Sequence, residues 1–155
     1  MPMQNDIVRL FDVNLNRARE GLRVLEDTAR FVLCSKKLCL PLRNARHKAA
    51  FITENIYPML VCGRDAQTDM GRKIKENARK DIFSLTAANF RRVQEALRVL
   101  EEYSKVLLPG AAKEFKSLRF VVYTLEKRFI NELNEFGKRE KNNTSGVAGS
   151  KRRKN

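Results

Sequence analysis

The sequence predicts an all-α protein: a helical bundle of two duplicated helical hairpins with pseudo-twofold symmetry, followed by a disordered basic C-terminal tail. Three observations lead to this fold class. The segment from Asn14 to Asp27 recurs from Asn89 to Glu102, with eight of 14 positions identical at a constant offset of 75. Apolar residues return every three or four positions, and no segment alternates as a half-buried strand does. A repeated segment predicts a repeated structural unit.

The first hairpin is predicted over residues 12–56. Asp12 is a good N-cap for a helix that runs to about Leu33. Ser35 can cap a second helix, in which Pro41 is tolerated only if the helix proper begins there. Tyr57-Pro58 ends this second helix. Its apolar stripe consists of Leu38, Leu42, Ala45, Ala49, Ile52 and Ile56.

A polar linker, from Cys62 to about Glu76, leads to the second hairpin. The chain from Asn77 to Leu108 predicts one long helix, or two short helices with a break near residues 84–86. Pro109-Gly110 ends this part, and a last helix carries an apolar stripe up to Gly137. The duplication extends into the last helix, because a Leu-Arg pair returns there at an offset of 76. The two pairs are Leu42-Arg43 and Leu118-Arg119.

The composition is that of a soluble helical protein with one domain, residues 1–137, and a tail, residues 138–155. Hydrophobic residues make up 43% of the 155 residues and charged residues 32%. The tail holds +6 of the net charge of +14, and the +8 on the domain favours a phosphorylated ligand. The K-R-R-K cluster of the tail can touch RNA or another polyanion, although such tails are usually solvated appendages.

The sequence shows no membrane-spanning segment and no signal peptide. The three cysteines, Cys34, Cys39 and Cys62, are odd in number and lack the partners of a zinc site. Reduced thiols and a cytoplasmic location are therefore expected.

Polar residues recur together with the leucines in the two copies. In each copy an arginine, a glutamate and an arginine step by three residues along a helix face away from the leucines, and an asparagine precedes them. The residues are Asn14, Arg17, Glu20 and Arg23, then Asn89, Arg92, Glu95 and Arg98. One interpretation is a ladder of exposed ion pairs worth about 0.2–0.5 kcal/mol each. The other is a phosphate-binding surface, because arginine offers a planar fork that lysine lacks.

The linker holds two aspartates, Asp65 and Asp69, close to Arg64 and Gly71. Carboxylates in a loop can hold magnesium through water and phosphate oxygens, but loop acids are more often turn-formers. The single histidine, His47, has no neighbouring nucleophile in the sequence and is interpreted as a surface residue. The chain also lacks the glycine-rich phosphate loops of common nucleotide-binding proteins.

Four segments carry the strongest signal of function. They read D-V-N-L-N-R-A-R-E-G-L-R-V-L-E-D (12–27), R-D-A-Q-T-D-M-G (64–71), A-N-F-R-R-V-Q-E-A-L-R-V-L-E-E-Y-S-K (88–105) and L-R-F-V-V-Y-T-L-E (118–126). In this order they resemble the alternative hydroxymethylpyrimidine phosphate kinase domain of thiamine biosynthesis. That helical domain is often fused N-terminal to thiamine-phosphate synthase. The resemblance covers roughly residues 6–135.

The resemblance implies ATP-dependent phosphorylation of 4-amino-5-hydroxymethyl-2-methylpyrimidine phosphate to its diphosphate. The implied cofactors are ATP and Mg²⁺, and a separate thiamine-phosphate synthase is an implied partner. We expect a stand-alone protein, since the residues after 137 are too few to form the synthase barrel. The expected catalytic residues are Arg17, Arg23, Arg92 and Arg98. The expected substrate-binding residues are Asn14, Glu20, Asn89, Glu95, Arg64 and Arg119, and the expected metal ligands are Asp65 and Asp69.

Two other classes of function compete with the kinase. The first is a non-catalytic module that binds the pyrimidine phosphate and delivers it to, or regulates, a separate synthase. The missing phosphate loop favours this module, whereas the paired arginines and loop acids favour the kinase. The second is a basic RNA-binding protein, for which the tail offers the only basic cluster.

Overall fold

The computed structural model describes residues 2–65, 67–75 and 78–150, and this part of the chain contains helices and loops but no strand, which confirms the all-α class. The α-helices are α1 (Pro2–Asp27), α2 (Lys36–Phe51), α3 (Tyr57–Cys62), α4 (Ile82–Leu107) and α5 (Ala112–Ser150). A π-helical turn, Thr28–Val32, follows α1. Short 3-10 turns occupy Glu54–Ile56, Met70–Lys73 and Pro109–Ala111.

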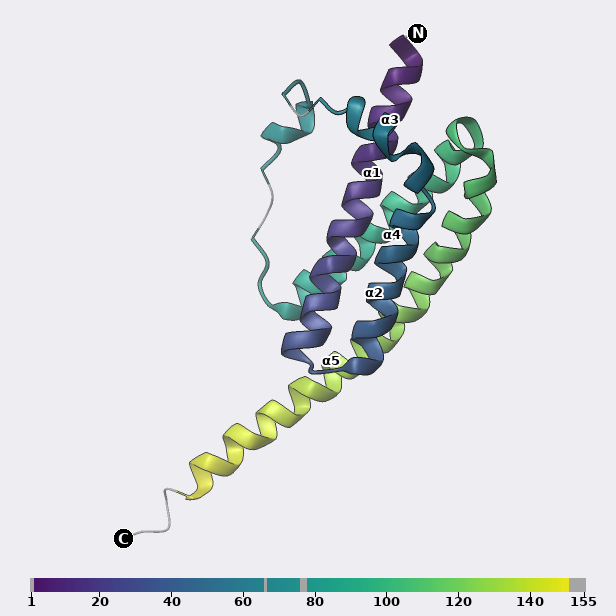
Figure 1. Ribbon diagram of the computed structural model, residues 1–155. Helices are drawn as coiled ribbons and strands as arrows, with labels where there is room; N and C mark the ends of the chain where they lie inside the picture. The colour runs from purple at the N-terminus through teal and green to yellow at the C-terminus, as the bar shows by residue number, and fades with distance from the viewer. Residues whose placement is uncertain (1, 66, 76–77, 151–155) are drawn as a thin grey trace.

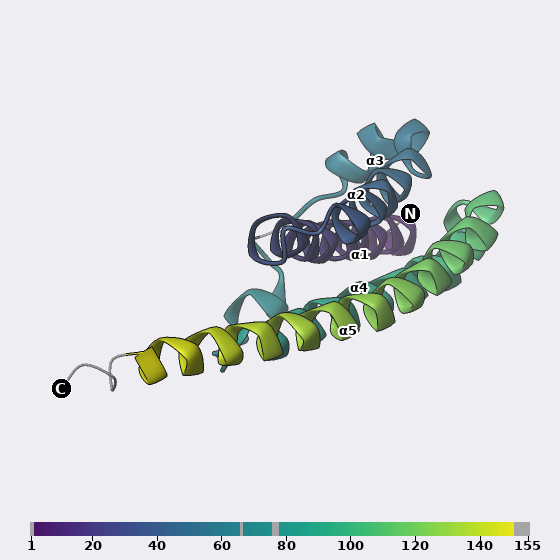
Figure 2. The same ribbon diagram turned by 90° about the horizontal axis from the view of Figure 1, so that it is seen from below.

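The four long helices form two layers. Figure 2 shows α1 and α2 side by side in one layer, with α4 and α5 side by side in the other. Helix α1 packs against α4, and the two run in opposite directions (Figure 1). The loop between α3 and α4 passes along the outer side of α1 (Figure 1). The central helix pair, α1 and α4, therefore carries both copies of the repeated segment.

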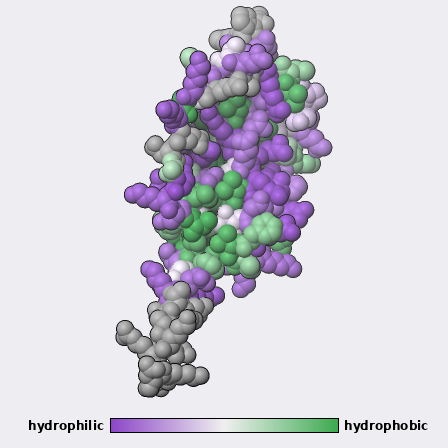
Figure 3. All heavy atoms as spheres, turned by 90° about the vertical axis from the view of Figure 1, so that its left-hand side faces the viewer, coloured by the Kyte–Doolittle hydropathy of each residue, from purple (hydrophilic) through white to green (hydrophobic). Residues whose placement is uncertain are grey.

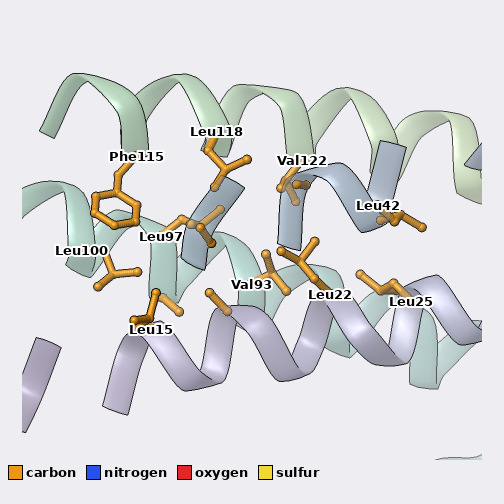
Figure 4. Packing of buried hydrophobic residues seen from close by; sticks show 14 of the residues in the cluster. Leu15, Leu22, Leu25, Leu42, Val93, Leu97, Leu100, Phe115, Leu118 and Val122 are labelled. Carbon is orange, nitrogen blue, oxygen red and sulfur yellow. The ribbon is translucent and has the colours of Figure 1, made fainter. Parts of the chain in front are cut away.

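The core lies between the two layers. Figure 4 shows leucines of α1 facing apolar side chains of α4 and α5, and its labelled residues include Leu15, Leu22, Leu25, Val93, Leu97, Leu100, Phe115 and Val122. Two edge-to-face aromatic pairs stabilise the core. Phe11–Phe115, with ring centroids 5.9 Å apart, joins α1 to α5 across the layers, and Phe90–Phe129, with centroids 5.5 Å apart, joins α4 to α5 within one layer. Such pairs add about 0.5–1.5 kcal/mol beyond the area they bury.

The first helix begins earlier than the sequence indicated. We predicted that Asp12 caps its N-terminus, but α1 begins at Pro2, and Asp12 lies inside it with a side chain only 4% exposed. Asp12 instead pairs with Arg64, 52 residues away, and a capping preference does not reveal so distant a partner. The π-helical turn carries the helix to Val32, close to the predicted end at Leu33.

Two prolines take different places from those we predicted. Helix α2 begins at Lys36 rather than at Pro41, so Pro41 lies inside the helix. Because proline has no backbone N–H, the helix lacks one hydrogen bond there. The burial of Leu38 and Leu42, which lie on either side of Pro41, offsets this loss. Pro58 does not end α2, which stops at Phe51, but lies in the first turn of α3, where a proline leaves no hydrogen bond unmade.

Helix α4 is one continuous helix without a break near residues 84–86, and it begins at Ile82 rather than at Asn77. A reciprocal capping box fixes this start. The Ser84 N–H donates to Asp81 Oδ1 at 2.7 Å, and the Asp81 N–H donates to Ser84 Oγ at 3.1 Å. These bonds satisfy two backbone donors that a helix N-terminus leaves free.

The last helix does not end at Gly137. Helix α5 continues to Ser150, so residues 138–150, which we expected in a disordered tail, are helical. A glycine inside a helix costs about 1 kcal/mol, but good helix formers surround it, and Lys138 pairs with Glu135 at 2.6 Å across this site. The K-R-R-K cluster, residues 151–154, lies outside the described residues.

The buried positions repeat between the two helix pairs. In α1 and α4 the offset is 75, so that Leu22 and Leu97 are both fully buried. In α2 and α5 the buried pattern follows an offset of 73 rather than 76, since Ala45 corresponds to Leu118 and Ala49 to Val122. The change of offset follows from the different turns that join each helix pair, a π-helical turn in one and a 3-10 turn in the other. The superposition of the two hairpins about a pseudo-twofold axis stays a prediction.

Gly21 lies at a close contact between α1 and α4. A Cβ atom built on Gly21 would lie 2.6 Å from Val93 Cγ2 and 3.4 Å from the Asn89 carbonyl oxygen. Val93 is fully buried and branched at Cβ, so its methyl group cannot move aside cheaply.

We expect Gly21→Ala to lower the free energy of unfolding by about 1 kcal/mol. Overpacking costs about 1–3 kcal/mol, and the gain in helix propensity returns about 1 kcal/mol. Urea denaturation followed by circular dichroism measures this change. Gly137→Ala is the matched control in a helix with open space around the added methyl, and a similar loss in the control would contradict the packing explanation.

Candidate active site

A cleft of about 670 Å³ lies between α1 and α4. It is lined by Asn14, Arg17 and Glu20 of α1 and by Ala88, Arg91, Arg92, Glu95, Ala96 and Val99 of α4. Because the two helices carry the same segment and run in opposite directions, they present the same residue types to one space. Five residues expected in the site are thus brought together: Asn14, Arg17, Glu20, Arg92 and Glu95. Arg91 also lines this cleft, and we missed it because it does not recur in the first copy.

The two asparagines that recur in the repeat each donate a hydrogen bond to the backbone of their own helix. Asn14 Nδ2 donates to the Leu10 carbonyl, and Asn89 Nδ2 donates to the Leu85 carbonyl, each at 2.9 Å. These bonds orient the amides and leave the oxygen of Asn14 as an acceptor at the cleft. Asn89 does not line the cleft, because it lies against Gly21 at the helix contact.

Each copy of the repeat carries a polar stripe, formed by its asparagine, arginine, glutamate and second arginine. The second arginines of the two polar stripes, Arg23 and Arg98, do not line the cleft. Arg23 Nε bonds Asp27 Oδ2 at 3.0 Å, and Arg98 bonds Glu101 at 2.9 Å and Glu102 at 2.8 Å. Both side chains are about half exposed, at 53% and 54%. Their contacts are those of intrahelical ion pairs.

The last glutamate that recurs in the repeat is a buried ion-pair centre. Glu26 accepts from Arg46 Nε at 2.8 Å, and Glu101 accepts from Arg119 Nη2 at 2.8 Å and from Arg119 Nε at 3.0 Å. The hydrogen bonds of Glu101, followed by that of Tyr123, raise the pKa of Arg119 above its ordinary value. Arg119, expected to bind substrate, thus ties α5 to α4. The sequence signal at this position was that a glutamate recurs in both copies, next to a buried leucine.

Arg64, also expected to bind substrate, anchors the loop to α1. Its Nε and Nη2 atoms donate to the two oxygens of the buried Asp12 at 2.7 and 3.0 Å. These hydrogen bonds raise the pKa of the guanidinium above its ordinary value. A two-pronged contact of this kind fixes both position and orientation, so the start of the loop is held beside α1.

The two linker aspartates shape separate turns of the loop. Asp65 accepts from the N–H groups of Gln67 and Thr68, each at 3.1 Å, and from the Thr68 hydroxyl. Asp69 accepts from the Gly71 N–H at 2.8 Å. Asp69 also lines a second hollow, of about 450 Å³, together with Asn14 and Arg17. The loop therefore brings one of the two expected metal ligands to the end of the arginine cleft.

Within the residues that the structure describes, no three histidine, cysteine, aspartate or glutamate side chains lie close enough together to hold a metal ion. A magnesium ion at this site would need most of its ligands from phosphate oxygens and water, which is the usual coordination of Mg²⁺ at nucleotides. The expected magnesium site stays a prediction.

We expect the turn at Asp65 to open in acid. The hydrogen bonds of Thr68 lower the pKa of Asp65 below its ordinary value of 3.8. A depressed carboxyl pKa contributes stability that is present above pH 3.8 and is lost as the pH falls through the lower pKa of the folded state. Amide hydrogen exchange at Gln67 and Thr68 measures the opening. Asp65→Asn should remove its pH dependence, and an unchanged dependence would contradict the assignment.

The loop between α3 and α4 lies on the left-hand side of Figure 1. Figure 3 shows this face, on which hydrophilic side chains dominate the upper part and hydrophobic side chains gather in the lower half. Val24 near the end of α1, and Ile82 and Phe83 at the start of α4, are exposed. No helix in the described part of the chain is long and apolar enough to cross a membrane.

Comparison with known proteins identifies a family and a set of relatives. The sequence model of the ThiD2 family matches residues 9–128. A protein of Nostoc punctiforme named thiamine-phosphate synthase is 43% identical over 131 residues, which are 83% of this chain and 36% of the relative. Proteins of the same name in Synechococcus sp. CC9605 and Nostoc sp. PCC 7120 are each 41% identical over 128 and 129 residues.

The chain spans only about a third of the length of these curated relatives, since it covers 36% of each of them. No solved structure matches the chain. The similarity therefore concerns one part of the relatives, and it includes both copies of the repeated segment.

Proposed function

The chain belongs to the ThiD2 family, and from this premise we propose that it acts in thiamine biosynthesis as a kinase. The proposed reaction transfers the γ-phosphoryl group of ATP to 4-amino-5-hydroxymethyl-2-methylpyrimidine phosphate. An oxygen of the acceptor phosphate forms a bond to the γ-phosphorus, and the bond from that phosphorus to the β,γ-bridging oxygen breaks. The products are the pyrimidine diphosphate and ADP. The names of the relatives, thiamine-phosphate synthase, support the pathway.

The observation that carries this proposal is the cleft between α1 and α4, in which arginines from two helices line one space. Phosphoryl transfer depends on positioning and on cations that neutralise the charge of the transferred group. Arg17 of α1 and Arg91 and Arg92 of α4 supply such cations. The acceptor is a phosphate oxygen, which is already ionised, so the reaction needs no strong general base.

Glu20 and Glu95 line the same cleft as the arginines. Their carboxylates are acceptors for the exocyclic amine of an aminopyrimidine, and they can also orient the arginine side chains. Asp69, beside Arg17 in the adjoining hollow, would hold magnesium on the ATP phosphates. The metal would supply further positive charge at the transferred phosphoryl group.

A non-catalytic module that binds the pyrimidine phosphate is the second candidate. The observation that favours it is that the sequence contains neither of the glycine-rich phosphate loops of common nucleotide-binding proteins. In this case the cleft would hold the pyrimidine phosphate for a separate thiamine-phosphate synthase.

One experiment separates the two candidates. The purified full chain is incubated with the pyrimidine phosphate, ATP and Mg²⁺, and ³¹P NMR detects the diphosphate. Calorimetry measures binding of the pyrimidine phosphate in parallel. Diphosphate formation supports the kinase. Tight binding without turnover would overturn the kinase and support the binding module, and an absence of both would overturn both proposals.

A further inference from the structure

A separate hollow of about 470 Å³ lies between α1, the end of α2 and the start of α3. Its lining includes Arg19 of α1 together with His47, Phe51, Glu54 and Tyr57. Arg19 follows Arg17 by two residues, about 200° around the helix, so the hollow and the cleft open on nearly opposite faces of α1. The volume lies within the range of about 300–1,000 Å³ that is typical of small-molecule sites.

Arg19 brings an unsatisfied donor to this hollow. Its Nε atom is buried and has no hydrogen-bond partner among the residues that the structure describes. A buried donor without an acceptor is destabilising, and native proteins rarely retain one without a reason. A carboxylate or phosphate group in the hollow would supply the acceptor once a turn of the Arg19 side chain exposes Nε to it, because guanidinium groups bind both of these anions with paired hydrogen bonds.

In the second copy of the repeat, the corresponding polar side chain finds its hydrogen-bond partner within the protein. The counterpart of Arg19 in α4 is Gln94, at the offset of 75. Gln94 Nε2 donates to Glu126 Oε2 of α5 at 2.6 Å. The counterpart of Glu126 in the first copy, at the offset of 73, is Thr53, whose hydroxyl donates to the Ala50 carbonyl. The first copy thus has a cation in place of the amide and a threonine in place of the carboxylate that pairs with it.

Aromatic side chains line the same hollow. Phe51 is 68% exposed and Tyr57 is 49% exposed, so both rings are accessible to a ligand in the hollow. Exposed rings beside a guanidinium favour a planar ligand that stacks on an aromatic face and directs its anionic group to the cation. Glu54 adds an acceptor for a donor group on such a ligand.

We propose that this hollow is a second ligand site, which binds a small aromatic molecule carrying a carboxylate or phosphate group through Arg19, with Phe51 and Tyr57 against its ring. The site does not depend on the kinase proposal, because it shares no lining residue with the cleft.

His47 makes this proposal directly testable, because it is the only histidine in the chain and lines the hollow. The imidazole signals of the ¹⁵N-labelled full chain are followed by NMR during titration with phenyl phosphate and, separately, with benzoate. We expect a saturable shift of the His47 signals with at least one of these two probes. The probe that binds more tightly shows whether the site prefers a phosphate or a carboxylate. Cyclohexyl phosphate, which lacks a planar ring, should bind more weakly than phenyl phosphate.

Arg19→Gln is the decisive variant, since it installs the residue that the second copy carries at this position. We expect it to keep its circular dichroism spectrum and to weaken the binding that His47 reports at least tenfold. Arg43→Gln, which removes the same charge from an exposed position of α2, should bind like the parent protein. No saturable shift with either probe, or equal affinity in Arg19→Gln and the parent, would overturn the proposal. Equal affinity for cyclohexyl and phenyl phosphate would overturn its aromatic part.

Discussion

Arg17→Ala is expected to lower kcat/KM for formation of the pyrimidine diphosphate about a hundredfold, the usual scale of a lost electrostatic contact to the transition state. Arg17 lines both the cleft and the adjoining hollow that contains Asp69, so it lies where substrate and nucleotide phosphates would meet. Its side chain is exposed and lies away from the core. The free energy of unfolding should therefore change by about 0.5 kcal/mol or less. Steady-state kinetics and urea denaturation measure the two quantities.

Arg23→Ala is the matched control for Arg17→Ala. It removes the same charge from the same helix, but Arg23 pairs with Asp27 and does not line the cleft. We expect less than a threefold effect on kcat/KM. Arg17→Lys should restore little activity, because an ammonium group cannot make a two-pronged contact with phosphate. Equal losses of kcat/KM in Arg17→Ala and Arg23→Ala would indicate an effect of net charge. Full activity in Arg17→Ala would show that the recurring arginines and glutamates form only a ladder of exposed ion pairs.

Glu101→Ala is expected to lower the free energy of unfolding by about 3 kcal/mol, the low end of the range for breaking a buried ion pair. The side chain of Glu101 is 6% exposed and that of Arg119 is 13% exposed, so the change leaves a nearly buried guanidinium without its carboxylate. It also removes the contact of Arg98 with Glu101. Urea denaturation monitored by circular dichroism measures the loss.

The neighbouring Glu102 provides the control for this prediction. Its side chain is 40% exposed, and it forms only intrahelical pairs with Arg98 and Lys105 in the described part of the chain, so Glu102→Ala should destabilise much less than Glu101→Ala. The double variant Glu101→Leu with Arg119→Met should recover most of the stability, because it removes both charges and keeps apolar volume. A double variant as unstable as Glu101→Ala would show that the pair fixes the packing of α5 against α4.

The repeated segment made much of the fold predictable, whereas the helix ends were not. Apolar spacing identified the buried faces of α1, α2, α4 and α5, because burial of a stripe dominates the stability of these helices. Helix ends depend on local terms of about 1 kcal/mol, which contacts with distant residues readily override. Asp12 shows this clearly, since an apparent N-cap proved to be the buried partner of Arg64.

The site was predictable where it depends on the repeat. The recurring polar residues lie on α1 and α4, and these two helices pack against each other. Arg17 and Arg92 therefore line one cleft. The recurrence of Glu26 as Glu101 pointed to the position of a buried ion pair, but the sequence did not identify the partners in such contacts, because no spacing rule relates Arg64 to Asp12 or Arg119 to Glu101. Two residues assigned to substrate binding on the family resemblance therefore proved to hold structural ion pairs.

The cleft is lined by matched residues from two antiparallel helices. Its two ends would therefore look almost alike to a ligand, which could enter in either of two opposite orientations. Such a site would bind an asymmetric substrate in two orientations, and one of them would place the reacting phosphate at the wrong end. Two features of this chain remove that ambiguity. Arg91 stands where the first copy has Asn16, and the loop brings Asp69 only to the end of the cleft that Asn14 and Arg17 form. If a duplication produced this cleft between its own copies, divergence at a few such positions would have given the site a direction.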